Sequence, residues 1–162
     1  MRDISYSTDD YIFSYRAAGI LIHDGKVLLQ KPGNGDGYAF PGGQVAFGET
    51  NSETLIREFG EEIGVDIDVV ELKWVQENLV PWANKPAHQI CLYHLVRLKD
   101  TESIPKRGRF ASKEYHENID DILYFYWIPI DEVKNITVYP SNAHELLHCI
   151  DDGVKHFVCL SE

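Results

Sequence analysis

Three glutamates, Glu58, Glu61 and Glu62, stand within the short segment REFGEEIGV at residues 57–65. Glu58 precedes Glu62 by four residues and Glu61 by three, so in a helix their carboxylates share one face, where like charges repel. Hard divalent cations such as Mg²⁺ bind carboxylate oxygens and commonly bridge them to the phosphates of a substrate. An isolated run of this kind is most often a solvated acidic face. The alternative interpretation is a divalent metal site that binds phosphate groups. The residues around the glutamates decide between the two interpretations.

A helix of about 13 residues is predicted to carry the three glutamates. Thr50 and Glu53 have the S/T-x-x-E spacing of a capping box, which begins a helix, and Gly64 is the residue type that commonly ends one. At about 100° per residue, apolar and acidic side chains fall on two separate arcs of roughly 100° each. The apolar arc, which should face the core, consists of Leu55, Ile56, Phe59 and Ile63.

The segment around these glutamates resembles the signature of the Nudix (MutT-like) hydrolase family. That signature reads G-x5-E-x7-R-E-U-x-E-E-x-G-U, with U an apolar residue, and residues 43–65 match all nine specified positions, from Gly43 through Glu49 to Val65. The surrounding order is also similar to the family, with a hairpin before the signature, FPGG leading into it, and strands and a helix after it. The resemblance implies an α/β (α+β) fold, an α/β/α sandwich with a mixed β-sheet, and a single domain over residues 1–162.

The resemblance further implies hydrolysis of phosphoanhydride bonds with Mg²⁺ or Mn²⁺ as cofactor. Glu58 and Glu62 would ligate the ion, and Glu61 would complete its shell or help to deprotonate water. The Gly43 carbonyl would add a neutral oxygen. Arg57 would orient the glutamates by a salt bridge, with Glu49 as one partner. Metal ions neutralise phosphate oxygens and lower the pKa of bound water, so this chemistry needs no covalent protein intermediate.

The rest of the chain is predicted to be mostly strands. Two apolar, β-rich runs flank the turn at residues 24–25 (DG), which is a strong hairpin signal. Residues 67–77, 90–98 and 123–128 also have strand composition. Residues 30–37 are predicted to form a glycine-rich loop and residues 100–121 a long polar loop. A second helix is expected from residues 141–142 to about residue 151, and residues 155–160 are ambiguous.

Composition restricts the partners of the protein. The formal net charge of −11, from 26 acidic and 15 basic residues, repels polyanions and argues against a nucleic acid polymer as partner. The three cysteines are far apart and form no C-x-x-C pair, which favours reduced thiols. The chain shows no signal-peptide pattern at its start and no run of about 18 apolar residues. These features predict a cytoplasmic protein without a membrane partner.

Several residues outside the signature are candidates for substrate binding. Family members often take a further carboxylate from a loop after the signature, and Glu114 and Glu117 lie in such a loop, although surface acids are more often simply solvated. Arg16, Tyr38 and Trp82 could hold a base or a terminal phosphate, whereas an aromatic residue at strand spacing usually belongs to the core.

The expected partner is a small nucleotide-like diphosphate, a nucleoside diphosphate linked to another moiety. Nucleoside triphosphates and nucleotide sugars are examples. ADP-ribose is the alternative, because Pro81 lies 16 residues after Val65, near a proline that Nudix enzymes acting on ADP-ribose often carry. The sequence leaves open the attacked phosphorus and whether the protein forms a homodimer.

Two other classes of protein compete with this interpretation. Residues 144–148 (HELLH) match the H-E-x-x-H pattern of zinc metalloproteases, with two histidines on one helical face. Such a match arises by chance in about one chain of this composition in forty, and only 14 residues follow it to supply a third ligand. A Nudix-like module that binds nucleotides without cleaving them would be expected to lack some signature carboxylates. This chain has all of them, so a hydrolase is favoured.

Overall fold

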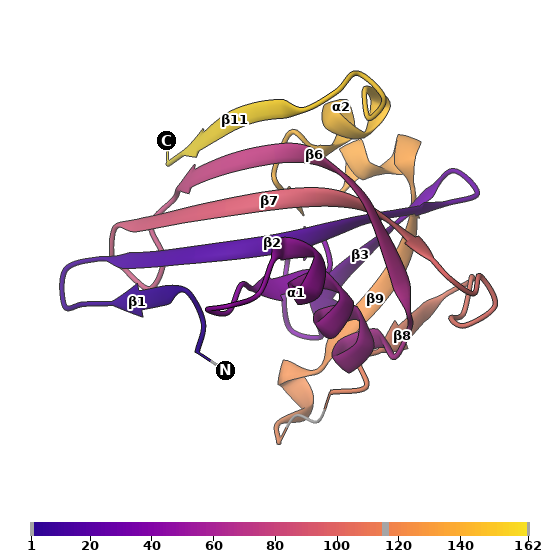
Figure 1. Cartoon of the computed structure of the whole chain (residues 1–162), viewed down its shortest axis with the longest axis horizontal. Helices are drawn as coiled ribbons and strands as arrows, with labels where there is room; N and C mark the ends of the chain where they lie inside the picture. The colour runs from indigo at the N-terminus through magenta and orange to yellow at the C-terminus, as the bar shows by residue number, and fades with distance from the viewer. Residues whose placement is uncertain (1, 115–116, 162) are drawn as a thin grey trace.

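The long hairpin β2–β3 is the centre of the fold (Figure 1) in the computed structural model, which describes residues 2–114 and 117–161. The described residues contain an 11-stranded sheet. Its strands are β1 (Ser5–Ser7), β2 (Ile12–His23), β3 (Lys26–Pro32), β4 (Tyr38–Ala39), β5 (Gly42–Gln44), β6 (Ile67–Leu79), β7 (Ala87–Leu98), β8 (Arg109–Ala111), β9 (Leu123–Pro129), β10 (Val138–Tyr139) and β11 (Lys155–Leu160).

Helical segments are short and few beside the strands. Among the described residues, no helix has both the length and the apolar character needed to cross a membrane. The α-helices are α1 (Asn51–Glu58) and α2 (Ala143–His148); a π-helical turn, η1 (Phe59–Ile63), continues α1, and two 3₁₀ segments are η2 (Ile119–Asp121) and η3 (Ile130–Asn135).

The predicted hairpin at residues 24–25 is confirmed. His23 of β2 pairs with Lys26 of β3, and the two residues between them have left-handed φ values, 48° at Asp24 and 71° at Gly25. Two consecutive left-handed residues match the right-handed twist of the flanking strands, which is why Asp-Gly is favoured there.

The sheet is mixed, as predicted. Its main path runs β10-β4-β3-β2-β7-β6-β11, and β2 pairs in parallel with β7 while it pairs antiparallel with β3 and β5. The ambiguous residues 155–160 form β11, which adds in parallel to β6. Strand β2 therefore joins the part of the sheet that carries β5 to the part that carries β9.

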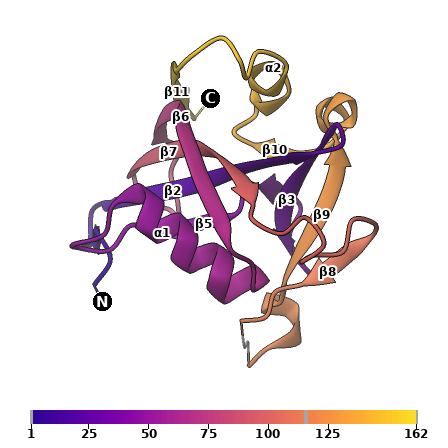
Figure 2. The ribbon, with the colours of Figure 1, turned by 45° about the vertical axis from the view of Figure 1, so that its right-hand side comes forward.

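Helices cover both faces of the sheet. Side chains alternate along β2, so Ala17 and Leu21 pack in one buried cluster while Ala18 and Ile20 pack in another. Figure 2 shows α1 and α2 in separate places around the sheet. The predicted α/β/α arrangement is thus observed. Leu55 of α1 and Phe59 of η1 belong to the first cluster, and Leu146 and Leu147 of α2 belong to the second.

Several predicted boundaries differ from the structure. Strand β3 extends to Pro32, inside the predicted loop 30–37, because residues 30–32 pair with residues 123–125 of β9. The polar loop 100–121 contains β8 and η2, and its residues 115 and 116 lie outside the described residues. Helix α2 ends at His148, three residues before the predicted end. The cysteines are free thiols, with Cys91 buried and the other two half-buried.

Candidate metal and catalytic site

The start and the end of the glutamate helix are formed by the residues predicted to form them. The Glu53 backbone N–H donates to Thr50 Oγ1 (3.2 Å), and the Thr50 N–H donates to Glu53 Oε2 (2.8 Å), which is a complete capping box. The α-helical pattern ends at Glu58 and continues as the π turn η1, which Gly64 terminates with φ of 76°. Such π turns are frequent at functional sites.

The buried face of α1 differs from the predicted apolar arc at one residue. Ile56 is 47% exposed, whereas Thr54 is fully buried. The Thr54 hydroxyl donates to Glu49 Oε2 (2.9 Å), so a polar side chain is tolerated inside because its hydrogen bond is made. Helix α1 therefore turns Thr54 rather than Ile56 toward the protein.

The Arg57 guanidinium donates hydrogen bonds to several surrounding oxygen atoms. Its Nε and Nη2 donate to the two carboxylate oxygens of Glu49 (2.8 and 3.0 Å). Its Nη1 donates to Glu58 Oε1 (2.7 Å) and Glu61 Oε2 (3.3 Å), and Nη2 also reaches the Gln44 carbonyl (3.3 Å). The Arg57 hydrogen bond lowers the pKa of Glu49 to about 2. The arrangement holds the carboxylates of Glu49 and Glu58 in place.

We expect Glu49→Gln to lower the free energy of unfolding at neutral pH by about 2 kcal/mol, the size of a charged hydrogen bond that loses its charge. The folded pKa lies below the ordinary 4.5, so this stabilisation is present above about pH 4.5 and is lost as the pH falls toward 2. Urea unfolding at several pH values measures it. The difference between wild type and variant should shrink as the pH drops, and equal stabilities at neutral pH would contradict the expectation.

Glu58 and Glu62 form the electrostatic centre of the site. Burial raises the pKa of Glu58 even though Arg57 opposes this, and burial with repulsion from Glu58 raises the pKa of Glu62 to about 7. Within residues 2–114 and 117–161, the buried Glu62 Oε2 has no hydrogen-bond partner. Gly43 packs closely against the Glu58 carboxylate, since a Cβ at residue 43 would lie 2.1 Å from Glu58 Oε1. Crowded carboxylate oxygens with excess negative charge fit a hard divalent cation.

Arg16 and Gln44 lie beside these carboxylates on paired strands. Arg16 of β2 is in register with Gln44 of β5, and its Nη2 donates to the Phe40 carbonyl (3.2 Å). The Arg16 charge lowers the pKa values of Glu58 and Glu62, opposing the effect of burial. Gln44 was not predicted from sequence. Its buried Oε1 has no partner among the described residues, and the one available signal was its place directly after the signature's first glycine.

The loop after β8 is attached to the end of the glutamate helix. Ser112 Oγ and the Lys113 backbone N–H donate to the Glu62 carbonyl (3.1 and 2.7 Å). Glu114 follows directly, and its charge contributes to the raised pKa of Glu62. Glu117 is exposed. The hydrogen bonds of Ser112 and Lys113 to the Glu62 carbonyl therefore bring Glu114 near Glu62. Within the described part of the chain, no such contact places Glu117, the other candidate carboxylate.

The two aromatic candidates occupy different surroundings. Tyr38 packs edge-on against Tyr126, with ring centroids 5.2 Å apart, and Lys31 Nζ lies 4.9 Å from the Tyr38 centroid. Trp82 is 65% exposed and lines three neighbouring hollows. Roles of Arg16, Tyr38, Trp82, Glu114 and Glu117 in substrate binding stay predictions.

Comparisons with known proteins agree with this geometry. The NUDIX domain model matches residues 14–149. The chain is 31% identical over 134 residues to an RNA pyrophosphohydrolase of Ruthia magnifica subsp. Calyptogena magnifica, covering 74% of this chain and 73% of that protein. The fold is similar to a UDP-X diphosphatase (TM-score 0.63, 21% identity, 96% of this chain and 68% of that one). It is also similar to an ADP-ribose pyrophosphatase of Streptococcus suis 89-1591 (0.57, 15%, 90% and 98%).

The family match covers the glutamate helix, most of β2, all of β5, and the loop attached to Glu62. The solved structures share the fold, while the sequence relative shares the family. The chain belongs to the Nudix family and is a hydrolase that acts on phosphoanhydride bonds.

Proposed function

We propose that the protein is a Mg²⁺- or Mn²⁺-dependent hydrolase of a nucleoside diphosphate linked to another moiety, with nucleoside triphosphates or nucleotide sugars as substrates. The observation that carries the proposal is the pair of half-buried carboxylates Glu58 and Glu62 near Gly43, including the buried Glu62 Oε2 that lacks a hydrogen-bond partner among the described residues. Nudix hydrolases generally use divalent metals, and this donor set suits one.

Each residue of the site would have a separate task. Glu58, Glu62 and the Gly43 carbonyl would hold the ion, and Glu61, which is exposed beside them, would complete the shell or accept a proton from water. A bound divalent ion neutralises phosphate charge and lowers the pKa of its water. Arg57 holds Glu58 in position through the 2.7 Å ion pair. Arg16 would offer a further positive charge to a phosphate oxygen.

Trp82 supports a nucleoside as one part of the substrate. A hollow of about 510 Å³ is lined by Trp82, Phe13 and Gln44, so it extends from the exposed indole to the residue next to Gly43. Aromatic side chains stack on bases with a strength of about 1–3 kcal/mol per base. We infer that the base binds near Trp82 while the diphosphate reaches the carboxylates.

ADP-ribose is a second candidate substrate. Pro81, the proline that suggested it, lines a neighbouring hollow of about 740 Å³ together with Trp82 and Tyr139. This hollow could take the ribose that lies beyond the diphosphate. The net charge of −11 favours such a small substrate over a polymer, although the sequence relative from Ruthia magnifica is named for RNA.

A substrate panel tests the proposed function. It contains nucleoside triphosphates, nucleotide sugars, ADP-ribose and an RNA oligonucleotide with a 5′-triphosphate, each with Mg²⁺ or Mn²⁺ in ¹⁸O-labelled water. We expect turnover to be highest for a triphosphate or a nucleotide sugar, with the label in a phosphate product that identifies the attacked phosphorus. Preference for ADP-ribose would support the second candidate, and preference for the oligonucleotide would contradict both.

The control for the panel is the Glu62→Gln variant under the same conditions. Phosphate release that persists in this variant would come from a contaminating activity rather than from the glutamate site. Hydrolysis of none of the compounds, with either metal, would contradict the proposal.

A further inference from the structure

Two histidines and an aspartate meet on the α2 side of the protein. His144 and His148 of α2 bring their Nε2 atoms to 3.0 Å, and His148 Nε2 lies 3.4 Å from Asp131 Oδ1 of η3. One ligand atom from each of the three lies within 4.8 Å of the other two. We propose that His144, His148 and Asp131 bind Zn²⁺ at a site separate from the glutamate site.

The observed spacing fits a tetrahedral ion. Zinc–nitrogen bonds of about 2.0–2.1 Å place two ligand atoms of a tetrahedron about 3.3–3.4 Å apart. The separations of His148 Nε2 from His144 Nε2 and Asp131 Oδ1, 3.0 and 3.4 Å, lie close to that value. A single proton on His148 Nε2 would have to be shared between two acceptors, His144 Nε2 and Asp131 Oδ1. A cation instead accepts a lone pair from all three atoms at once, and water would complete four-coordination.

The backbone beneath the three ligands is fixed by buried residues. Leu146 and Leu147 of α2 and Val133 of η3 belong to the same core cluster. The histidines are four residues apart and therefore share one helical face. Asp131 and His148 are exposed, so an ion from solution can reach them. Little rearrangement is needed before an ion binds.

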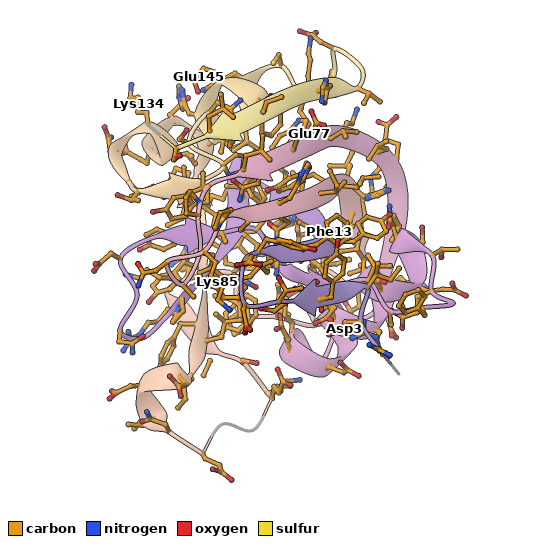
Figure 3. The ribbon with its side chains drawn as sticks, turned by 90° about the vertical axis from the view of Figure 1, so that its left-hand side faces the viewer. Asp3, Phe13, Glu77, Lys85, Lys134 and Glu145 are labelled. Atoms are coloured by element: carbon orange, nitrogen blue, oxygen red, sulfur yellow. The ribbon has the colours of Figure 1, made fainter. Side chains whose placement is uncertain are left out.

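The third ligand precedes the HELLH segment in the chain. Residues after His148 were the expected source in a metalloprotease, but Asp131 comes from η3, just before β10. Glu145, the general base of the protease pattern, is exposed and is not one of the three clustered ligands. Figure 3 shows Glu145 near Lys134, at the end of the molecule where α2 and η3 meet. The three residues therefore form a site that binds zinc and not the active site of a peptidase.

The two metal sites differ in donor chemistry. Two imidazole nitrogens and one carboxylate suit Zn²⁺, whereas Mg²⁺ prefers oxygen ligands such as those of Glu58 and Glu62. Helices α1 and α2 also pack in different core clusters. Zn²⁺ at the histidine site should therefore bind in the presence of excess Mg²⁺. Zinc binding by His144, His148 and Asp131 requires neither the substrate nor the glutamates.

Zinc titration of the full chain tests the site. The protein is first freed of metal with a chelator and then titrated with Zn²⁺ against a chromophoric zinc indicator, with excess Mg²⁺ present. We expect one zinc equivalent to bind. Removing a ligand in His148→Ala or His144→Ala should weaken binding by at least about 100-fold, since even residues that only support a ligand contribute about 10- to 100-fold.

Thermal unfolding gives a second readout, because the ion would link α2 to η3. Zn²⁺ at about 100 times its dissociation constant should raise the melting temperature by about 5 °C or more. Asp131→Asn keeps the size of the exposed side chain and should reduce both the affinity and this shift. Its unaltered circular dichroism would show that the fold is kept.

Two control variants leave the three ligands intact. His156→Ala removes an exposed histidine that contacts Glu77 Oε2 (3.1 Å) on β6; Figure 3 labels Glu77 beside β11. Cys149→Ser removes the thiol next to His148. Both should bind zinc like wild type. Wild-type zinc affinity in His148→Ala would overturn the proposal, as would zinc binding that disappears in Cys149→Ser or in Glu62→Gln.

Discussion

Glu62→Gln should lower kcat by at least about 100-fold in saturating Mg²⁺, the upper end of what residues that merely support a metal ligand cost. Glutamine keeps the size of the side chain but removes the negative charge that a divalent ion requires. The same change should not destabilise the metal-free protein. Burial and Glu58 disfavour the ionised Glu62 carboxylate, so a neutral group at this position relieves repulsion.

Activity and stability therefore separate in this variant. Thermal unfolding in a chelator should give Glu62→Gln a melting temperature equal to or above that of wild type, while the stabilisation that Mg²⁺ confers on wild type should disappear. Glu61→Gln is the comparison. Its loss of kcat should be smaller than that of Glu62→Gln if the exposed Glu61 only completes the shell of the ion, and about as large if Glu61 accepts the proton from water. Wild-type turnover of Glu62→Gln in saturating Mg²⁺ would overturn the assignment of the glutamate site.

Local patterns in the sequence predicted most of what positions the glutamates. The capping box at Thr50 and Glu53, the stop at Gly64 and the turn at residues 24–25 each depend on a few adjacent residues, and all are found in the structure. Such features can be predicted from sequence because a cap or a turn is determined by short-range hydrogen bonds and allowed φ values.

The π turn could not be predicted in the same way. Regular periodicity of 3.6 residues predicted one α-helix up to Gly64, but the pattern changes after Glu58. Gly60 lies in this turn, and a Cβ there would meet open space. A π turn has i→i+5 hydrogen bonds in place of the i→i+4 bonds of an α-helix, so it alters the directions of the Glu61 and Glu62 side chains.

Contacts between distant segments were also beyond the sequence. Nothing in the polar loop 100–121 indicates that Ser112 and Lys113 bind the Glu62 carbonyl, or that Glu114 thereby comes near Glu62. Asp131 and His148 likewise come together only because η3 and α2 share a core cluster. Both cases depend on tertiary packing, which a pattern within one segment does not encode.

The second large effect is expected at Gly43, and its neighbour Gly42 is the natural comparison. In Gly43→Ala the new Cβ would lie 2.1 Å from Glu58 Oε1, so the carboxylate at the free end of that side chain must move. A displacement of about 1 Å at a catalytic group can cost about 100-fold in rate. The free energy of unfolding should fall by only about 1 kcal/mol, because the atoms that the new Cβ meets are at the free end of the Glu58 side chain.

Gly42→Ala should have the opposite profile. Its Cβ would lie 2.2 Å from the Ala17 carbonyl oxygen, and its φ of 151° is one that alanine rarely adopts. The obstacle is the backbone of β2, which is paired on its other edge with β7 and cannot yield without disturbing the sheet. A loss of about 3 kcal/mol or more in the free energy of unfolding is expected. Urea unfolding and kcat are measured on both variants. We expect Gly42→Ala to lose mainly stability and Gly43→Ala to lose mainly activity. A Gly43→Ala variant with wild-type kcat would show that Glu58 need not occupy its observed position for catalysis.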